Sequence, residues 1–480
     1  MFTKFRRLVT VVVIVALVLL ALFFTLFYFR EYITNYFVHA TFTQMDVPQH
    51  TRLLVLSPHP DDGVIAAGGL MERVLATGGI VKVVYVTAGD GFEIAAQDFY
   101  HRRTLSHAYY QEYAYTRYQE TKNALGSLGI GEQNISWLGF PDGGTNAMWN
   151  ASWATSAAYT SPYSGFDKTA YSFSYHADQL YNAANAVEDL QQIINAYQPT
   201  MVVMPGVFDL HPDHNTVYRM GTVAVLNSTD PHAAIYYYIV HHGFWPTPQG
   251  LHEDTYLVPP ADVIRLFPHW QSLDLSTQEV AGKKNALEQY RSQMITIGDF
   301  ILSYVRQNEI FYPYEPHRVT LAAPSLAAAP STSTRVSLPI FGTNPFVSFY
   351  PGSRIDQAYV DFSPETVTFH LDLADETDYR MNYEWSLKGQ DQNGTYTAYT
   401  FDVSGDGKLA ETTNGTAVHN SAVQLHITND RQHIVLTAPA SMFAQNKWLF
   451  IDAKSFNSRF STLSNAYWTY VAVSDGRHAQ

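Results

Sequence analysis

The chain has 480 residues and a formal net charge of −14, with 29 Lys and Arg against 43 Asp and Glu. This length exceeds what one compact core accommodates, so it predicts two or three domains. No run of basic residues lies beyond the first few positions, and the electrostatic basis for tracking a phosphate backbone is therefore missing, which excludes nucleic acid as a partner. Cysteine is absent, so any metal must be bound by histidines and carboxylates.

The amino-terminal segment is strongly apolar. Residues 8–29 carry no charge and follow a basic flank at residues 4–7. A helix of this length would cross a hydrocarbon core of roughly 30 Å, and the flank predicts a cytoplasmic amino terminus. We therefore expect residues 1–30 to be a transmembrane anchor and residues 31–50 a juxtamembrane segment, with the catalytic part outside the cytoplasm. The alternative is secretion after cleavage of a signal peptide near residue 40.

Strand-like and helical patterns alternate from residue 51 to residue 320. This alternation is typical of an α/β fold, and we expect a Rossmann-like, mostly parallel sheet flanked by helices. The predicted strands are 52–57, 81–87, 135–138, 201–204 and 235–240, and the predicted helices are 64–76, 118–128, 178–197, 214–226 and 279–295. Such sheets place their ligand sites at the carboxyl ends of the strands, where functional residues are expected.

The composition changes near the end of this region. Residues 321–335 are rich in Ala, Pro, Ser and Thr, which is typical of an extended linker. Residues 336–480 then show strand-like alternation with Asn-Gly and Gly-Asp-Gly turns. We expect an all-β, sandwich-like domain there, without a residue pattern that indicates its role.

Two short clusters of His and Asp directly follow two predicted strands. The first contains His59, Asp61 and Asp62, and the second contains His211, Asp213 and His214. Strand ends of one sheet could bring the clusters together, and two imidazoles with one carboxylate and an open position are the ligand set of a catalytic zinc. Either cluster alone is more typical of ordinary surface or core residues, whereas the pair favours a metal site.

Together with other ordered motifs, these clusters resemble the PIG-L or LmbE-like family of zinc-dependent N-acetylglucosaminyl deacetylases. The resemblance covers roughly residues 51–313. The motifs that carry it are Pro58–Asp62, Thr87–Gly91, Arg117 with Glu120, Leu138–Gly143, His211–His214, His242 with Gly243, and Ser292 with Gln293.

The resemblance implies a role for individual residues. Zinc would be bound by His59, Asp62 and His214, with Asp61 as the general base and His211 facing the reacting oxygen. Residues expected on the substrate side are Arg117, Asp142 and His242, although an ion pair with Glu120 is the ordinary interpretation of Arg117 and a turn that of Asp142. Asp213 either orients an imidazole or complements a helix dipole. The chain departs from the family at Gly63, where an acidic residue is usual, which puts the local support of the site in doubt.

Two long segments rich in aromatic residues, 92–118 and 145–175, are expected as loops. Ordinary loop packing is the simpler interpretation of each aromatic residue, whereas together they suit the wall of a sugar-binding site. The resemblance thus implies a zinc-dependent hydrolase that removes acetyl from an N-acetylated amino sugar. The alternatives are a zinc amidase for another N-acylated substrate and a non-catalytic surface protein that binds carbohydrate.

Overall fold

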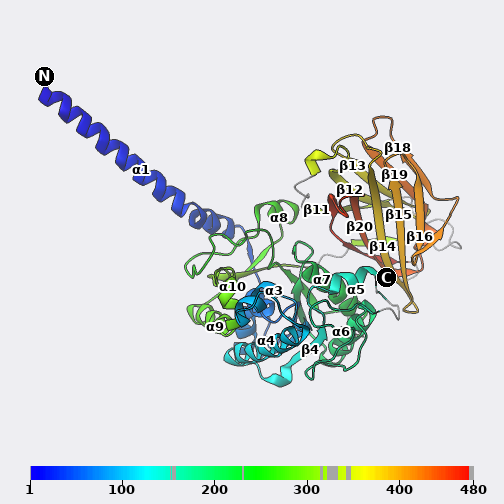
Figure 1. The fold of residues 1–480 in the computed structure, drawn as a ribbon, viewed down its shortest axis with the longest axis horizontal. Helices are drawn as coiled ribbons and strands as arrows, with labels where there is room; N and C mark the ends of the chain where they lie inside the picture. Colours follow the sequence, from blue (N-terminus) through cyan, green and yellow to red (C-terminus); the bar gives the residue numbers. More distant parts are fainter. Residues whose placement is uncertain are drawn as a thin grey trace. The chain divides into compact units, whose positions relative to one another are not determined.

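The computed structural model describes residues 2–151, 153, 158–229, 232–313, 317–321, 333–341 and 347–474. The chain divides into two compact units, Met1–Pro313 and Tyr314–Gln480. Figure 1 shows that the first unit is built of helices and strands and the second of strands. The predicted linker, residues 321–335, falls mostly on positions 322–332, outside the described residues.

The first unit is organised around one mixed sheet of eight strands. Their order is β1 (Thr43–Gln44), β7 (Gln271–Asp274), β8 (Asn308–Pro313), β6 (Ala234–Tyr238), β5 (Met201–Pro205), β2 (Arg52–Ser57), β3 (Ile80–Thr87) and β4 (Ile135–Phe140). The five strands from β6 to β4 are parallel, whereas β8 is antiparallel to both β6 and β7. The central strands are apolar and buried along their length, as parallel strands covered on both faces must be.

Helices cover both faces of this sheet (Figure 1). One group consists of α2 and the helices that contact it directly or through one another. These are α2 (Asp62–Ala76), α3 (Glu93–Tyr100), α4 (His107–Ser127), α9 (Thr277–Leu287) and α10 (Arg291–Leu302). The other packs through α7 and comprises α5 (Thr145–Ala151), α6 (Ala183–Tyr197) and α7 (Pro212–Leu226), while the short α8 spans Ala261–Leu266. The expected α/β architecture is therefore present, and its sheet is mostly parallel, with antiparallel pairing only at β8.

Two expectations about helices differ from the structure. The helix expected over 279–295 is two helices, α9 and α10, which are interrupted at residues 288–290, and the backbone N–H of Ser292 in the first turn of α10 donates to Glu120 Oε1 at 2.8 Å. Residues 92–118, expected as a loop, form α3 and the first half of α4. Their aromatic residues pack into a small core with Tyr110 and Tyr113, which stabilises helix where the sequence pattern is weak.

The amino-terminal helix α1 spans Phe2–His39. A membrane crossing needs about 20 consecutive apolar residues, and within the described part of the chain no helix meets the length and apolarity of such a span. The predicted single-pass placement is therefore wrong, and the predicted transmembrane helix and membrane partner have no support in the described residues. The last turns of α1 instead hydrogen-bond to the α/β unit, with Tyr32 Oη 2.7 Å from His252 Nδ1 and His39 Nε2 2.7 Å from Asp274 Oδ1.

The second unit consists of two sheets that share one core, and their strand pairs are antiparallel except for β9 with β22, which are parallel. The first sheet is ordered β10 (Thr334–Leu338), β12 (Ile355–Phe362), β13 (Thr366–Leu373), β19 (His433–Pro439) and β18 (Gln424–Ile427). The second is ordered β11 (Ile340–Phe341), β21 (Ser464–Ala466), β20 (Asn446–Asn457), β14 (Met381–Asp391), β15 (Tyr396–Ser404), β16 (Leu409–Thr413) and β17 (Thr416–Val418), with β22 (Thr469–Ser474) on β20 and β9 (His317–Thr320) on β22.

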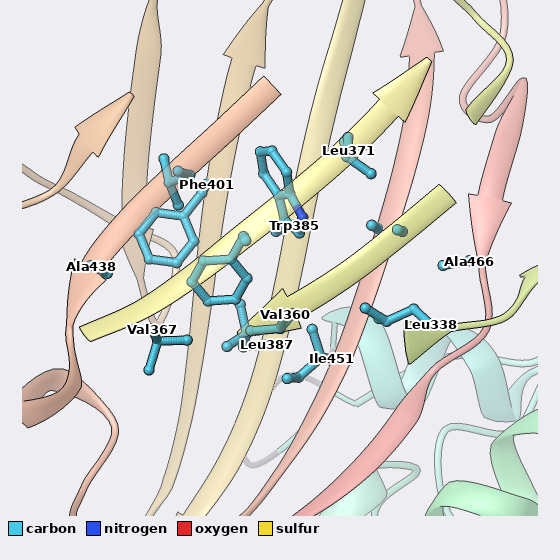
Figure 2. Close-up of a cluster of buried hydrophobic side chains, with 14 of the residues drawn as sticks. Leu338, Val360, Val367, Leu371, Trp385, Leu387, Phe401, Ala438, Ile451 and Ala466 are labelled. Atoms are coloured by element: carbon cyan, nitrogen blue, oxygen red, sulfur yellow. The ribbon is translucent and has the colours of Figure 1, made fainter. Parts of the chain in front are cut away.

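Strict alternation of buried and half-buried side chains along β13 shows that only one face of its sheet lies against the core. Figure 2 shows side chains of both sheets meeting there, including Val360 and Leu371 from one sheet and Trp385, Leu387 and Phe401 from the other. The carboxy-terminal region is therefore β-rich and has its own apolar core.

Candidate active site

The candidate site lies at the carboxyl ends of the parallel strands. The turn after β2 carries His59 and Asp61 and leads into α2, for which Asp61 is the N-cap residue. The segment after β5 carries Asp209 and leads into α7, for which His211 is the N-cap residue. Because β2 and β5 are neighbours in the sheet, the two clusters that are about 150 positions apart in sequence lie side by side.

Three side chains converge on one point between these turns. Asp62 Oδ2 is 2.9 Å from His59 Nδ1 and 2.9 Å from His214 Nε2, and the two nitrogens are 3.2 Å apart. All three side chains are nearly or fully buried. Ligand atoms on a tetrahedral zinc with bonds of about 2.0–2.1 Å are about 3.3 Å apart, so this donor set fits a divalent metal in both chemistry and spacing.

Each of the two imidazoles has a carboxylate on its other ring nitrogen. His59 Nε2 is 3.1 Å from Asp213 Oδ2, and His214 Nδ1 is 2.9 Å from Asp209 Oδ2. Burial opposes a charge on His214, but Asp209 and Asp62 outweigh it and raise the pKa of His214 to about 9. This arrangement, in which carboxylates orient metal-facing imidazoles, is typical of metal sites.

Asp209 was not singled out by the sequence pattern. Its Oδ2 also accepts the backbone N–H groups of Val240 at 2.7 Å and His241 at 3.1 Å, and its Oδ1 accepts that of His211 at 3.1 Å. One fully buried carboxylate thus joins the ends of β5 and β6. Its place just before the second His/Asp cluster is the signal that could have identified it.

Asp61 is held beside the cluster by a buried arginine. Arg117 Nη2 donates to Asp61 Oδ1 at 2.9 Å, and Arg117 Nη1 donates to the Gly89 carbonyl at 3.0 Å. Burial and the adjacent Asp62 raise the pKa of Asp61, although the Arg117 guanidinium lowers it. Arg117, expected on the substrate side, therefore contacts the carboxylate next to the metal-facing cluster and not Glu120, whose carboxylate binds Ser292.

Asp142 lies on the other side of His59. Its Oδ1 is 3.3 Å from His59 Nε2, its Oδ2 is 3.7 Å from Arg117 Nη1, and Gly91 donates to Oδ2 at 3.1 Å. Burial opposes ionisation, but the nearby His59 lowers the pKa of Asp142. The sequence left two interpretations of Asp142 open, a turn residue or a residue of the site. The structure shows that it is both.

His211 has a defined tautomer in its neutral form. Its Nδ1 accepts the backbone N–H of Asp213 at 3.2 Å, so the proton of the neutral ring is on Nε2. Burial and the neighbouring His59 and His214 lower the pKa of His211 to about 4. The ring therefore acts as a neutral hydrogen-bond donor through Nε2 near neutral pH.

Of the two adjacent histidines after β6, the structure brings the unexpected one to the cluster. His242 Nδ1 is 3.1 Å from the Phe208 carbonyl and its Nε2 is 3.1 Å from Asp262 Oδ2. His241 instead belongs to a group with His59, Asp62 and His214 whose ligand atoms all lie within 4.8 Å of one another. Neighbouring residues of an extended chain point to opposite sides, so the sequence alone did not distinguish them.

Residues 54–225 match the family model described as "PIG-L: GlcNAc-PI de-N-acetylase". This segment runs from β2 to α7 and includes both His/Asp clusters. Residues 54–225 are therefore similar to the PIG-L family.

Curated relatives agree with this assignment. The chain is 26% identical over 183 residues to a 1D-myo-inositol 2-acetamido-2-deoxy-alpha-D-glucopyranoside deacetylase of Catenulispora acidiphila, covering 38% of this chain and 50% of the relative. It is 29% identical over 180 residues to the enzyme of the same description from Actinosynnema mirum, covering 37% of this chain and 56% of the relative. The chain therefore spans about half the length of the curated relatives it matches.

Solved structures with detectable similarity include the A40926 pseudoaglycone deacetylase Dbv21, at 19% identity and a TM-score of 0.37, covering 55% of this chain and 97% of that one. Another is the N,N'-diacetylchitobiose deacetylase of Pyrococcus horikoshii, at 21% identity and a TM-score of 0.32, covering 55% of this chain and 84% of that one.

The first cluster is supported without an acidic side chain at Gly63. The Ser57 hydroxyl donates to the His59 carbonyl at 2.6 Å and accepts the Gly63 backbone N–H at 2.9 Å. A Cβ at Gly63 would lie 3.4 Å from the Ser57 side chain. The turn that carries His59 is thus closed by a serine of β2.

Tyrosines of the segment after β4 border the candidate site. Tyr163 lies close enough to Gly91 that a Cβ there would come within 3.0 Å of its ring, and a Cβ at Gly144 would come within 2.5 Å of the Tyr159 ring. Behind them, Tyr171 Oη donates to Asp90 Oδ2 at 2.7 Å, and burial raises the pKa of Asp90 to about 6. The two glycines let these rings approach the turns at the strand ends.

Proposed function

We propose that this protein is a zinc-dependent hydrolase that removes the acetyl group from an N-acetylated amino sugar. The observation that carries the proposal is the convergence of His59 Nδ1, Asp62 Oδ2 and His214 Nε2 at separations of 2.9–3.2 Å, at the strand ends of the segment that is similar to the PIG-L family. When bound, zinc would supply Lewis-acid charge and lower the pKa of a water molecule.

Asp61 is the general base in this proposal. It is adjacent in sequence to the metal-facing Asp62, and Arg117 fixes its Oδ1 at 2.9 Å, which leaves Oδ2 to take a proton from the attacking water. The guanidinium also prevents Asp61 from turning away from the site. Arg117 is thus a positioning residue in this proposal.

His211 is the group that faces the reacting oxygen. With Nδ1 engaged by the backbone of Asp213, its Nε2–H donates a hydrogen bond to the oxygen on which negative charge develops as water adds to the acetyl carbonyl. Collapse of the tetrahedral species breaks the C–N bond and releases acetate and an amine. The amine takes the proton that Asp61 removed from the water, because His211, with its pKa lowered to about 4, is neutral and has no second proton to give.

The sugar class is supported by the relatives, which are described as deacetylases of a 2-acetamido-2-deoxyglucopyranoside. The Tyr159 and Tyr163 rings beside the glycine turns offer an apolar surface with hydroxyl edges, which suits a sugar ring. In the proposed complex the acetamide enters the buried cluster and the ring lies against these tyrosines. Asp142 is then close to the sugar hydroxyls.

The test combines metal analysis with acetate release. We expect about one zinc per chain in the purified protein, loss of zinc in His59→Ala and His214→Ala, and acetate release from N-acetylglucosamine-type glycosides. A parallel panel of N-acetylated amino acids distinguishes a general amidase. Zinc binding without acetate release from any acetamido sugar would overturn the substrate class, and absence of zinc binding would overturn the whole proposal.

A further inference from the structure

His241 differs from the other imidazoles around the cluster. His59, His211 and His214 each have at least one ring nitrogen in a hydrogen bond with a carboxylate or a backbone group. In the described portion of the chain, neither ring nitrogen of His241 has such a partner. A histidine at the edge of a buried charged cluster with both nitrogens available is a candidate ligand.

The nitrogen of His241 faces an oxygen that the rest of the cluster leaves open. Asp62 uses Oδ2 for both His59 and His214, while its Oδ1 lies 3.9 Å from His241 Nε2. This distance is too long for a hydrogen bond. It falls within the separation of two atoms bound to one zinc, which ranges from about 3 Å to about 4 Å with the bond angle.

The position of His241 is held from two sides. Its backbone N–H donates to Asp209 Oδ2 at 3.1 Å, the same oxygen that lies 2.9 Å from His214 Nδ1. Its ring stacks on Phe300 of α10, with ring centroids 5.3 Å apart and planes 12° apart, and meets His214 edge to face at 4.7 Å. The ring is therefore fixed between α10 and the buried cluster.

We propose that His241 is a fourth protein ligand of the metal, on the solvent side of the three buried donors. This inference rests on the proposed function, because it concerns the same metal position. The His241 side chain is 32% exposed, against 0–8% for His59, Asp62 and His214. Catalytic zinc sites expand to five ligands, so a fourth protein donor still leaves a position for solvent.

The adjacent histidine provides a matched control. His242 is one residue away but is engaged by Phe208 and Asp262, so its loss should not alter the metal position. His241→Phe is the preferred substitution, because the new ring can still stack on Phe300 but has no nitrogen that could bind the metal. His241→Gln serves as a second variant with a smaller, polar side chain if His241→Phe does not fold, as judged by circular dichroism.

Zinc affinity is measured by competition with a chromophoric chelator, and the visible spectrum is recorded after saturation with Co²⁺. We expect His241→Phe to weaken zinc binding about tenfold or more and to change the Co²⁺ absorption bands, while His242→Phe stays within about twofold of wild type. Unchanged affinity and an unchanged Co²⁺ spectrum in both His241 variants would overturn the inference while leaving the proposed function intact. A wild-type protein that binds no zinc would instead overturn both.

Discussion

Arg117 donates to Asp61 across 2.9 Å, and the two side chains are only 3% and 6% exposed. The arginine is on α4 and the aspartate caps α2, so this pair joins two helices as well as two charges. A buried pair of this kind contributes little when intact relative to an apolar replacement, but removal of one partner leaves an uncompensated charge.

Arg117→Met should therefore be strongly destabilising. We expect the free energy of unfolding to fall by about 3–5 kcal/mol, because Asp61 is left buried without its counter-charge. Urea denaturation of wild type and variant measures this loss. The double variant Arg117→Met with Asp61→Asn should recover part of it, and a single variant as stable as wild type would contradict the pairing.

Asp61→Asn should separate chemistry from metal binding. The substitution removes the proposed general base, so kcat/KM for an acetamido sugar should fall by about 10²–10⁴-fold. Zinc content should stay at the wild-type level, because Asp61 is not in the group of residues that could hold the metal, which is His59, Asp62, His214 and His241. The measurement pairs acetate release with elemental analysis on the same preparation, and wild-type turnover in the variant would refute the base assignment.

Asp209→Asn tests the carboxylate behind His214. The amide keeps the shape of the side chain but weakens the interaction with His214 Nδ1, which lies 2.9 Å away. We expect zinc affinity to decrease about 10–100-fold, the usual effect of losing such a partner. Chelator competition measures it, and Asp262→Asn, next to His242 on the surface, is the control that should leave affinity unchanged.

The free energy of unfolding should decrease with rising pH through the titration of Asp90. Its pKa is raised by burial from 3.8 to about 6, so the folded state takes up a proton more readily than the unfolded state. The stabilisation from this proton is fully present below about pH 4 and is lost as the pH rises through about 6. Asp90→Asn lacks this titration.

The stability difference between Asp90→Asn and wild type should consequently shift in favour of the variant as the pH rises from about 4 to about 6. Denaturation curves at several pH values, compared between the two proteins, measure the shift. A difference that stays constant over this interval would show that Asp90 titrates normally in the folded protein.

Much of the α/β framework follows from local pattern. The strand expected at 52–57 coincides with β2, and those expected at 81–87 and 201–204 differ from β3 and β5 by one residue. Continuous apolar, β-branched runs are unambiguous when a strand is buried on both faces. The short antiparallel β7 has no such run and was not predicted.

The candidate site was likewise predicted only in part. Which residue types carry the chemistry was apparent from two clusters that each directly follow a strand, and their proximity followed from the rule that parallel strands end at one edge. Asp209 and His241 were not apparent, because a single Asp or one of two adjacent His residues has no periodicity that marks it.

The sequence by itself determined the alternation of the central strands and helices, the His and Asp clusters at the ends of β2 and β5, and the similarity of residues 54–225 to the PIG-L family. Only the tertiary structure decided that Arg117 binds Asp61, that Asp209 supports His214, and that His241 rather than His242 approaches the cluster. The physical reason is that backbone propensity and burial are encoded locally, whereas the direction of a polar side chain depends on partners brought together by strand order and helix packing.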